Sequence, residues 1–313
     1  MRDKLMIDDF NDFCLYMYVT VDDVYKETTK LITRPGPAPD SSDSEVITTA
    51  LVGECRGWDM ETEMLSHWED HRDLFPNLPT QSRFNRRRRN LMRVINVIRG
   101  VVLNLLDVAQ DSHCAIDSLP IPVVNFHWVP SASCEWAIHQ AAFGKVSSKK
   151  LTIFGYKLHL LVTLSGVILD FVLAPANAAD LTLASELLEP HTDYTILGDK
   201  AYISAAIAAD LLRTNRLTLM TLPRSNQKVH VSAYARRLFN SARQIIETIN
   251  GQLTEQFQIE HNHAHTFEGL CARLYTKLAA HTLCIFINRL LGRDDFLHIK
   301  SLAFANYLDF VQT

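Results

Sequence analysis

Residues 151–173 read LTIFGYKLHLLVTLSGVILDFVL, two β-rich runs separated by Ser165-Gly166. A short Ser-Gly step between two apolar runs predicts a β-hairpin. Shorter apolar runs lie on either side of this hairpin, at residues 114–123, 194–197 and 217–222. Helical patterns alternate with the later runs. The sequence therefore predicts an α/β fold whose sheet contains both antiparallel and parallel strands.

Helical patterns occupy most of the chain outside these runs. They precede the hairpin at residues 7–30, 43–51, 59–70 and 84–107, and follow it at 180–188, 204–212, 233–257 and 267–291. A linker with three prolines separates the first two helices at residues 32–42. We expect a helical N-terminal region over residues 1–110, an α/β domain over 111–293 and a C-terminal tail over 294–313.

The composition is that of a globular chain. Of its 313 residues, 47% are hydrophobic and 21% are charged, which excludes a disordered or collagen-like protein. No stretch of about 18 uncharged apolar residues occurs, and acids stand near the start where a signal peptide needs an apolar core. The six cysteines contain no C-x-x-C pair, so neither a disulfide framework nor a zinc site is indicated. We expect a cytoplasmic protein with no membrane partner.

The charge is unevenly distributed. The net charge is −4, but the first 80 residues alone carry −10, which leaves +6 for the rest. Three windows, at residues 79–106, 136–169 and 211–246, contain 18 of the 31 basic residues and no acid. Such windows are often solvated faces, but they also suit a polyanion, which binds with release of counterions. Nucleic acid is therefore a candidate partner.

Three carboxylates stand where the order of elements brings them together. Asp117 lies in the first short strand, Asp199 follows a later strand, and Glu247 lies in the helix after the sheet. If the two strands are parallel neighbours, both aspartates emerge at adjacent strand ends, and a helix across that face delivers the glutamate. Three such oxygen donors suit a pair of divalent cations that perform phosphoryl displacement. Taken singly, each carboxylate also fits a turn or a solvated helix position.

A basic residue accompanies the glutamate on its helix. Arg243 and Glu247 are four residues apart and share a helical face. An arginine in this position is suited to gripping a phosphate, and the alternative is a simple surface ion pair.

These motifs together resemble the DDE transposases of bacterial insertion sequences. The resemblance rests on five phrases in order: CAIDSLPI at 114–121, FGYKLH at 154–159, APANAAD at 174–180, GDKAY at 198–202 and R-x-x-x-E at 243–247. The phrase SDSEVIT at 42–48 and the short length resemble the group numbered nine-eight-two. Related transposases often carry Tyr three residues before the arginine and Lys seven after the glutamate; here these positions are Asn240 and Thr254.

The resemblance implies a ribonuclease-H-like mixed sheet flanked by helices, and cut-and-paste chemistry on DNA. It implies that Asp117, Asp199 and Glu247 are catalytic and hold two Mg²⁺ ions, for which Mn²⁺ can substitute. The expected partners are the terminal inverted repeats and the target DNA, with a homodimer on DNA because two ends are cut together. A nuclease of the same fold that does not join DNA, and a non-catalytic DNA-binding derivative, are the alternatives.

Basic residues outside the carboxylate set are candidate DNA contacts. Besides Arg243, Lys157 and His159 share one face of the predicted hairpin, opposite Tyr156. The other candidates are four consecutive residues on one helix: Arg86, Arg87, Arg88 and Arg89. Because consecutive residues spread around most of a helix, these four cannot all face one groove. We expect at least one of them to be free or to pair with the acidic first 80 residues.

Overall fold

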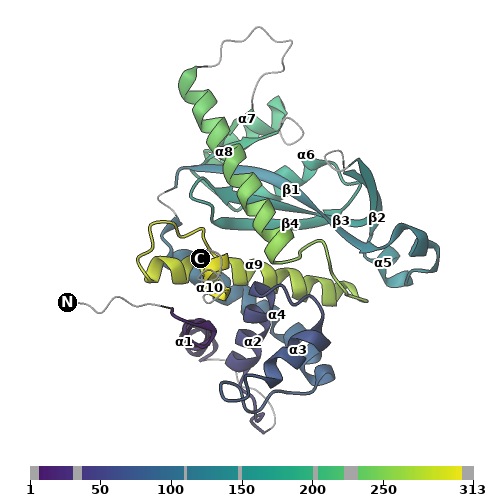
Figure 1. The fold of residues 1–313 in the computed structure, drawn as a ribbon. Coiled ribbons are helices and arrows are strands. Elements are labelled where there is room, and N and C mark those ends of the chain that lie inside the picture. Colours follow the sequence, from purple (N-terminus) through teal and green to yellow (C-terminus); the bar gives the residue numbers. More distant parts are fainter. Residues whose placement is uncertain are drawn as a thin grey trace, which may run out of the picture. The chain divides into compact units, whose positions relative to one another are not determined.

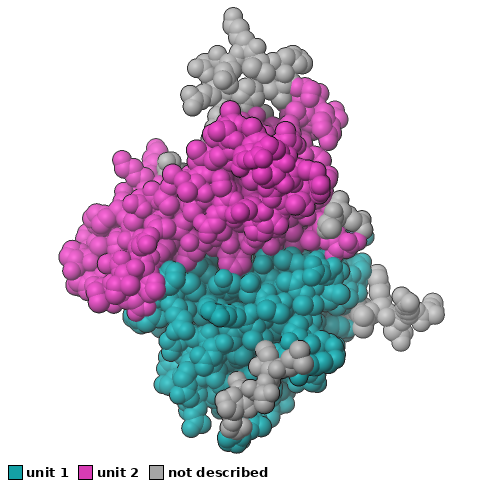
Figure 2. Space-filling view, turned by 180° about the vertical axis from the view of Figure 1, so that it is seen from behind, with its two compact units in different colours: residues 1–106, 253–313 teal, residues 107–252 magenta. Residues whose placement is uncertain are grey.

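The computed structural model describes residues 7–30, 37–108, 111–146, 150–199, 204–221 and 232–304. The basic residues Lys149, Lys200, Arg224 and Lys228 and the end of the GDKAY phrase lie outside the described residues. The chain forms two compact units, residues 1–106 with 253–313 and residues 107–252 (Figure 2). The first junction is close to the predicted boundary at 110. Residues 253–293, which we assigned to the α/β domain, instead belong to the helical unit.

The helical unit combines the N-terminal helices with the C-terminal ones (Figure 1). The long helix α9 contacts both α2 and α4. All the helices predicted for this part of the chain are confirmed, with ends that differ by a few residues. Their bounds are α1 Phe10–Thr29, α2 Asp43–Cys55, α3 Glu61–Glu69, α4 Gln81–Leu105 and α9 Phe267–Leu290. A further short helix, α10 Lys300–Ala303, was not predicted and lies in the segment expected to be a tail.

Helix α2 begins where the sequence predicts because its first residues form a capping box. The Ser42 side chain accepts a hydrogen bond from the Glu45 backbone N–H, and the Glu45 side chain accepts one from the Ser42 backbone. This reciprocal pair satisfies two backbone donors that a helix start leaves without partners.

Helix α9 is the apolar centre of the helical unit. Among the described residues, it is the one helix long and apolar enough by composition to cross a membrane, but 83% of its most apolar window is buried inside the protein. Most of the side chains of α9 from Leu270 to Asn288 are buried. The helix therefore has the burial of a core helix, packed by its neighbours on most sides.

Buried charges tie α9 to the N-terminal helices. Glu54 on α2 forms ion pairs with Arg88 on α4 and Lys277 on α9, and all three side chains are almost fully buried. Lys277 also donates to the Phe257 carbonyl at 2.5 Å. Burial alone would raise the pKa of Glu54, but Lys277, Arg88 and Arg273 together lower it below its usual value. The carboxylate is thus held ionised between cations from two helices.

The four consecutive arginines of α4 have different environments. Arg88 is 3% exposed and also lies 3.5 Å from Glu61, so its assignment as a DNA contact is wrong: its side chain is part of the core. Arg87 pairs with Asp43 at 2.6 Å, and Arg89 lies 3.3 Å from Glu268. Arg86 is exposed. The expectation that part of this run pairs with the acidic first 80 residues is confirmed.

The second unit is built on a six-stranded mixed sheet with the order β2-β3-β1-β5-β6, in which β4 also pairs with β3 (Figure 1). The central strand β1 pairs antiparallel with β3 and parallel with β5. This confirms the predicted hairpin, the later parallel strands and the ribonuclease-H-like mixed α/β class. The bounds are β1 His113–Val124, β2 Ala142–Val146, β3 Leu151–Thr163, β4 Ile168–Pro175, β5 Thr195–Gly198 and β6 Thr218–Met220.

Helices cover both faces of this sheet. Cys114 and Ile116 of β1 form a buried cluster with α6 and α7 residues such as Leu187 and Leu211. Because side chains alternate along a strand, Ala115 and Asp117 face the other side, where α8 packs on β1 (Figure 1). The bounds of these helices are α6 Asp180–Leu188, α7 Ala205–Asn215 and α8 Ala233–Gly251.

Some elements of this unit were not predicted. They are the edge strand β2, the 3-10 helix η2 Phe126–Ser131 and the short helix α5 Cys134–Ile138. The predicted helix 233–257 is also not continuous, because α8 ends at Gly251 and a π-helical turn, η5, follows over Gln252–Gln256.

Removing one partner of the buried charge cluster is expected to destabilise the protein. Lys277→Met leaves the buried Glu54 with one cation fewer, and the free energy of unfolding should fall by about 3 kcal/mol. Arg213→Met, at an exposed pair with Asp210, is the control and should change it by less than about 0.5 kcal/mol. Urea denaturation followed by circular dichroism measures both values; equal effects would contradict a structural role for the cluster.

Candidate active site

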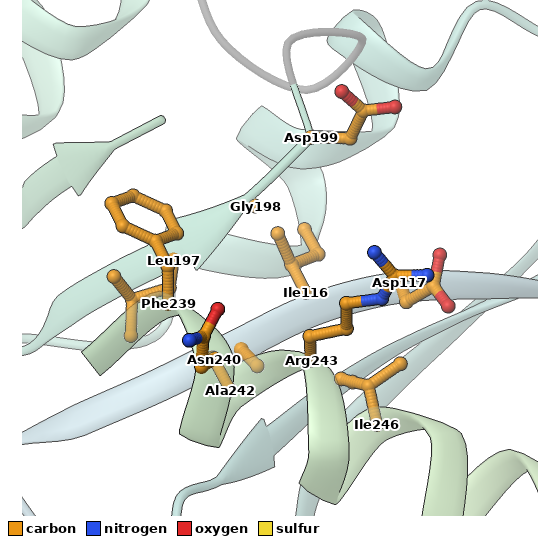
Figure 3. Close-up of a pocket in the computed structure, with 11 residues that line it drawn as sticks. Ile116, Asp117, Leu197, Gly198, Asp199, Phe239, Asn240, Ala242, Arg243 and Ile246 are labelled. Atoms are coloured by element: carbon orange, nitrogen blue, oxygen red, sulfur yellow. The ribbon is translucent and has the colours of Figure 1, made fainter. Parts of the chain in front are cut away.

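The register of two parallel strands brings two of the predicted carboxylates together. Ile116 of β1 pairs with Gly198 of β5. The next residue on each strand is an aspartate, Asp117 on β1 and Asp199 after β5. Because the two strands are parallel neighbours, these aspartates occupy matching positions just beyond the last paired residues, although β1 itself continues to Val124. Both line one pocket of about 450 Å³ (Figure 3).

Helix α8 forms the other wall of this pocket. Its lining residues follow helical spacing and therefore share one face of the helix: Phe239, Asn240, Ala242, Arg243 and Ile246. The buried side chains of Ala242, Ile246 and Ile249 hold α8 against the sheet. The apolar stripe of the helix thus fixes which of its polar residues reach the aspartates.

The polar residue of α8 that contacts Asp117 is Asn250. Its Nδ2 donates to Asp117 Oδ2 at 2.9 Å. Sequence reasoning did not single out Asn250, although it follows the buried Ile246 by four residues and so lies at the edge of the apolar stripe. The hydrogen bond orients the carboxylate of Asp117 toward the helix.

The electrostatic environment of Asp117 is unfavourable to its charge. Burial raises its pKa, hydrogen bonds from the Ser118 backbone and Asn250 lower it, and the nearby Asp199 and Asp180 raise it again, so that the net pKa lies above the usual value. A cation in this pocket would relieve both the burial cost and the repulsion.

Asp180 is a further acid of this site, and Lys157 compensates it. Lys157 Nζ lies 2.9 Å from Asp180 Oδ1, with both side chains about one-quarter exposed or less. The ammonium group predicted to contact DNA is therefore engaged by a carboxylate at the start of α6. The APANAAD phrase was the signal that could have identified Asp180, since it ends on this residue.

His159 does not fit its predicted role as a DNA contact. It lies within β3, opposite Ser118 of β1 and Val172 of β4, and its side chain has no exposed surface. Burial lowers its pKa to about 4, so the ring is neutral at neutral pH and offers no charge to a phosphate. The assignment was wrong because strand alternation predicts a shared face but not whether that face is covered.

Glu247 lies beside the pocket rather than in it. It follows Ile246 by one residue, about 100° around the helix. Its side chain is 63% exposed and accepts a hydrogen bond from Arg243 Nε at 2.8 Å. Arg243 itself lines the pocket, so the cation that pairs with Glu247 also faces the space shared by the two aspartates. The predicted meeting of all three carboxylates is not found in this structure, in which the third acid is neutralised by an arginine.

The donor set nevertheless suits a hard divalent cation. Besides Arg243, the polar side chains that line the pocket are those of Asp117, Asp199 and Asn240, which offer carboxylate and amide oxygens; none is a thiol or an imidazole. Oxygen ligands of this kind are those that Mg²⁺ prefers. Within the described part of the chain, no group of three His, Cys, Asp or Glu is close enough to hold a metal ion. Two of the three predicted ligands therefore fit, and Glu247 would have to leave Arg243 to join them.

A mixed sheet with one aspartate on its central strand and another at the end of the neighbouring parallel strand, covered by a helix, is the arrangement of a ribonuclease-H-like domain. The family described as "Transposase DDE domain" matches residues 109–266, about half of the chain, including the whole sheet and α8. This chain belongs to the DDE transposases. No curated protein and no solved structure matches it.

Arg243 should matter more to DNA cleavage than Arg236 on the same helix, because it lines the aspartate pocket while Arg236 is exposed and is not among the lining residues. We expect Arg243→Ala to slow cleavage by about 100-fold and Arg236→Ala to have little effect. Arg243→Lys should rescue poorly, since lysine cannot form the paired hydrogen bonds of a guanidinium with a phosphate. Single-turnover cleavage assays measure these effects. If Arg243→Ala and Arg236→Ala both lose little activity, Arg243 has no role beyond its surface ion pair with Glu247.

Proposed function

We propose that this protein is the transposase of a bacterial insertion sequence of the group numbered nine-eight-two, which cuts the ends of its element and joins them to target DNA. The observation that supports the proposal is the pairing of Ile116 with Gly198, after which Asp117 and Asp199 follow at matching positions and line one pocket. The match to the family supports the reaction class.

Asp117, Asp199 and Glu247 would hold two Mg²⁺ ions, and Mn²⁺ would substitute. When bound, two such ions supply Lewis-acid activation of the attacking and leaving oxygens of a phosphodiester. To complete this set, Glu247 exchanges its ion pair with Arg243 for the pocket. Because that pair is exposed, with side chains 81% and 63% accessible, its loss costs little.

The side chains of the protein have tasks of their own in this reaction. Asn250 orients Asp117 through its amide hydrogen bond. Arg243, once released by Glu247, presents a planar guanidinium to the scissile phosphate and fixes its orientation by paired hydrogen bonds. Lys157 offsets the charge of Asp180, which keeps a further negative charge near Asp117 from opposing the approach of DNA.

DNA is the partner on which this function depends. We propose that the helical unit binds the terminal inverted repeats, with Arg86 among its contacts, and that the second unit engages the target DNA. Arg89 and Lys157 are half-buried or paired and would contribute less. Two ends must be cut together, so the active form would be a homodimer on DNA, acting in the cytoplasm at the nucleoid.

The deciding experiment is incubation of the protein with DNA that carries the ends of its element, with and without Mg²⁺, followed by mapping of the cut 3′ ends. A supercoiled target in the same reaction separates two activities. Joined products indicate a transposase, whereas cut ends without joining indicate a nuclease. Binding without any metal-dependent cut would point to a non-catalytic derivative.

Alanine at any of the three carboxylates should abolish cleavage and preserve binding to DNA. Asp117→Ala, Asp199→Ala and Glu247→Ala each remove a metal ligand, and losses of at least about 1,000-fold are expected for a chemical step that needs both ions. Asp210→Ala, at an exposed acid paired with Arg213, is the matched control. Cleavage near the wild-type rate by one of the three variants would remove that residue from the site.

A further inference from the structure

A second pocket, of about 450 Å³, lies in the helical unit and has a basic lining. It is formed by the loop before α2, the loop before α4 and the first turns of α4. Four arginines line it, Arg72, Arg83, Arg86 and Arg87, with Asp40 as the single acid among the lining residues. This pocket is separate from the aspartate pocket, which lies wholly in the other unit.

Two of the four arginines are already compensated by carboxylates. Arg72 donates twice to Glu69, at 2.7 and 2.8 Å, and once to the Pro76 carbonyl. Arg87 pairs with Asp43 at 2.6 Å through one Nη, while its buried Nε has no hydrogen-bond partner within the described chain. These pairs hold the walls of the pocket in place and add no net charge.

The other two arginines give the pocket its excess positive charge. Arg83 and Arg86 are exposed, and neither makes an ion pair with any part of the chain that the structure describes. They are three residues apart and therefore project from one side of α4. Set against Asp40, they leave a net charge of about +1, which matches the single negative charge of one phosphodiester.

The backbone of α4 adds to this positive potential. Thr80 is the N-cap residue, but its side chain makes no capping hydrogen bond, and the first turn of α4 contains no acid. Cations near a helix N-terminus oppose the helix dipole, whereas an anion there is favourable. The arginines and the uncapped helix start thus repel one another until an anion occupies the pocket.

We propose that this pocket binds one phosphodiester of the DNA backbone, held between Arg83 and Arg86 at the start of α4. A guanidinium fork suits phosphate oxygens, and the pocket is open to a ligand that continues beyond it. The inference rests on the proposed function, because it takes DNA as the ligand. The basic residues of α4 would then have two roles: Arg83 and Arg86 contact a phosphate at the start of the helix, whereas Arg87 and Arg88 form ion pairs within the protein.

The first test measures binding of a fluorescein-labelled DNA duplex in EDTA over a range of salt concentrations. Arg83→Ala and Arg86→Ala should each weaken binding about tenfold. The double variant should lower the slope of log K against log salt by about 0.9, the value for one phosphate, and not by twice that amount. Arg93→Ala is the matched control, since Arg93 is exposed on the same helix two turns beyond Arg86, outside the pocket.

The second test changes the charge of the pocket without touching an arginine. Thr80→Asp and Thr80→Asn both supply the missing cap, so both should raise the melting temperature. Thr80→Asp also places a carboxylate in the pocket, and it alone should weaken DNA binding several-fold. Equal binding by the two variants would overturn the proposal, even if the arginine variants had failed to fold.

The remaining outcomes separate this inference from the proposed function. If wild-type protein binds the duplex and the Arg83→Ala/Arg86→Ala variant keeps the same salt slope, the proposal for this pocket is overturned while the proposed function stands. Equal losses at Arg93 would indicate a diffuse basic helix and would also overturn it. Wild-type protein that does not bind DNA overturns both. If inorganic phosphate raises the melting temperature of wild type but not of the double variant, while DNA binding is equal in both, the pocket is a free-phosphate site instead.

Discussion

The parallel pairing of Ile116 with Gly198 is the constraint on which the candidate active site depends. It sets Asp117 and Asp199 at matching positions, and strand alternation then directs Asp117 to the α8 face. A slip of one residue in β1 would turn Asp117 toward the apolar cluster around Cys114 and Ile116. Because β1 is buried against helices on both faces, such a slip would bury a carboxylate among leucines and isoleucines. The core therefore enforces the register, and the register positions the carboxylates.

Acidic residues have two different uses in this chain. In the helical unit, Glu54, Glu61 and Asp43 serve as internal partners for arginine and lysine. In the second unit, burial raises the pKa of Asp117, and the nearby charges of Asp199 and Asp180 raise it further. The first use stabilises a fold without any ligand, whereas the second creates a demand for a cation. Three of the acids in the first 80 residues, Asp43, Glu54 and Glu61, are thus buried parts of the fold.

Much of the fold could be predicted from the sequence because its signals are local. The hairpin at 151–173 and the helix at 180–188 follow from strand composition, a Ser-Gly turn and an aspartate followed by a helical pattern. Strand β2 was missed because its five residues, AFGKV, include a glycine and a lysine and lie at an edge. Nothing in the pattern of residues 233–257 indicates the π-helical turn after Gly251.

The site was predicted less completely than the fold because rotation and burial are tertiary properties. Helical spacing relates Arg243 to Glu247, but it does not say which of Glu247 and Asn250 faces Asp117. The apolar stripe through Ile246 and Ile249 decides that. Likewise, four identical arginines carry no periodic signal, and Arg88 is internal only because Glu54 and Thr276 come to it from distant parts of the chain.

The discontinuity of the helical unit has a consequence for how the chain acquires its structure during synthesis. The sheet and α8 form one uninterrupted segment that is complete at residue 252. The helical unit closes only when α9 is added, since Lys277 comes 223 residues after its partner Glu54. Until then, Glu54 can pair with Arg88 but not with Lys277, and the apolar faces of α2 and α4 that pack on α9 remain exposed. During synthesis the ribonuclease-H-like unit is therefore complete first, and the helical unit can finish folding only after α9 has emerged.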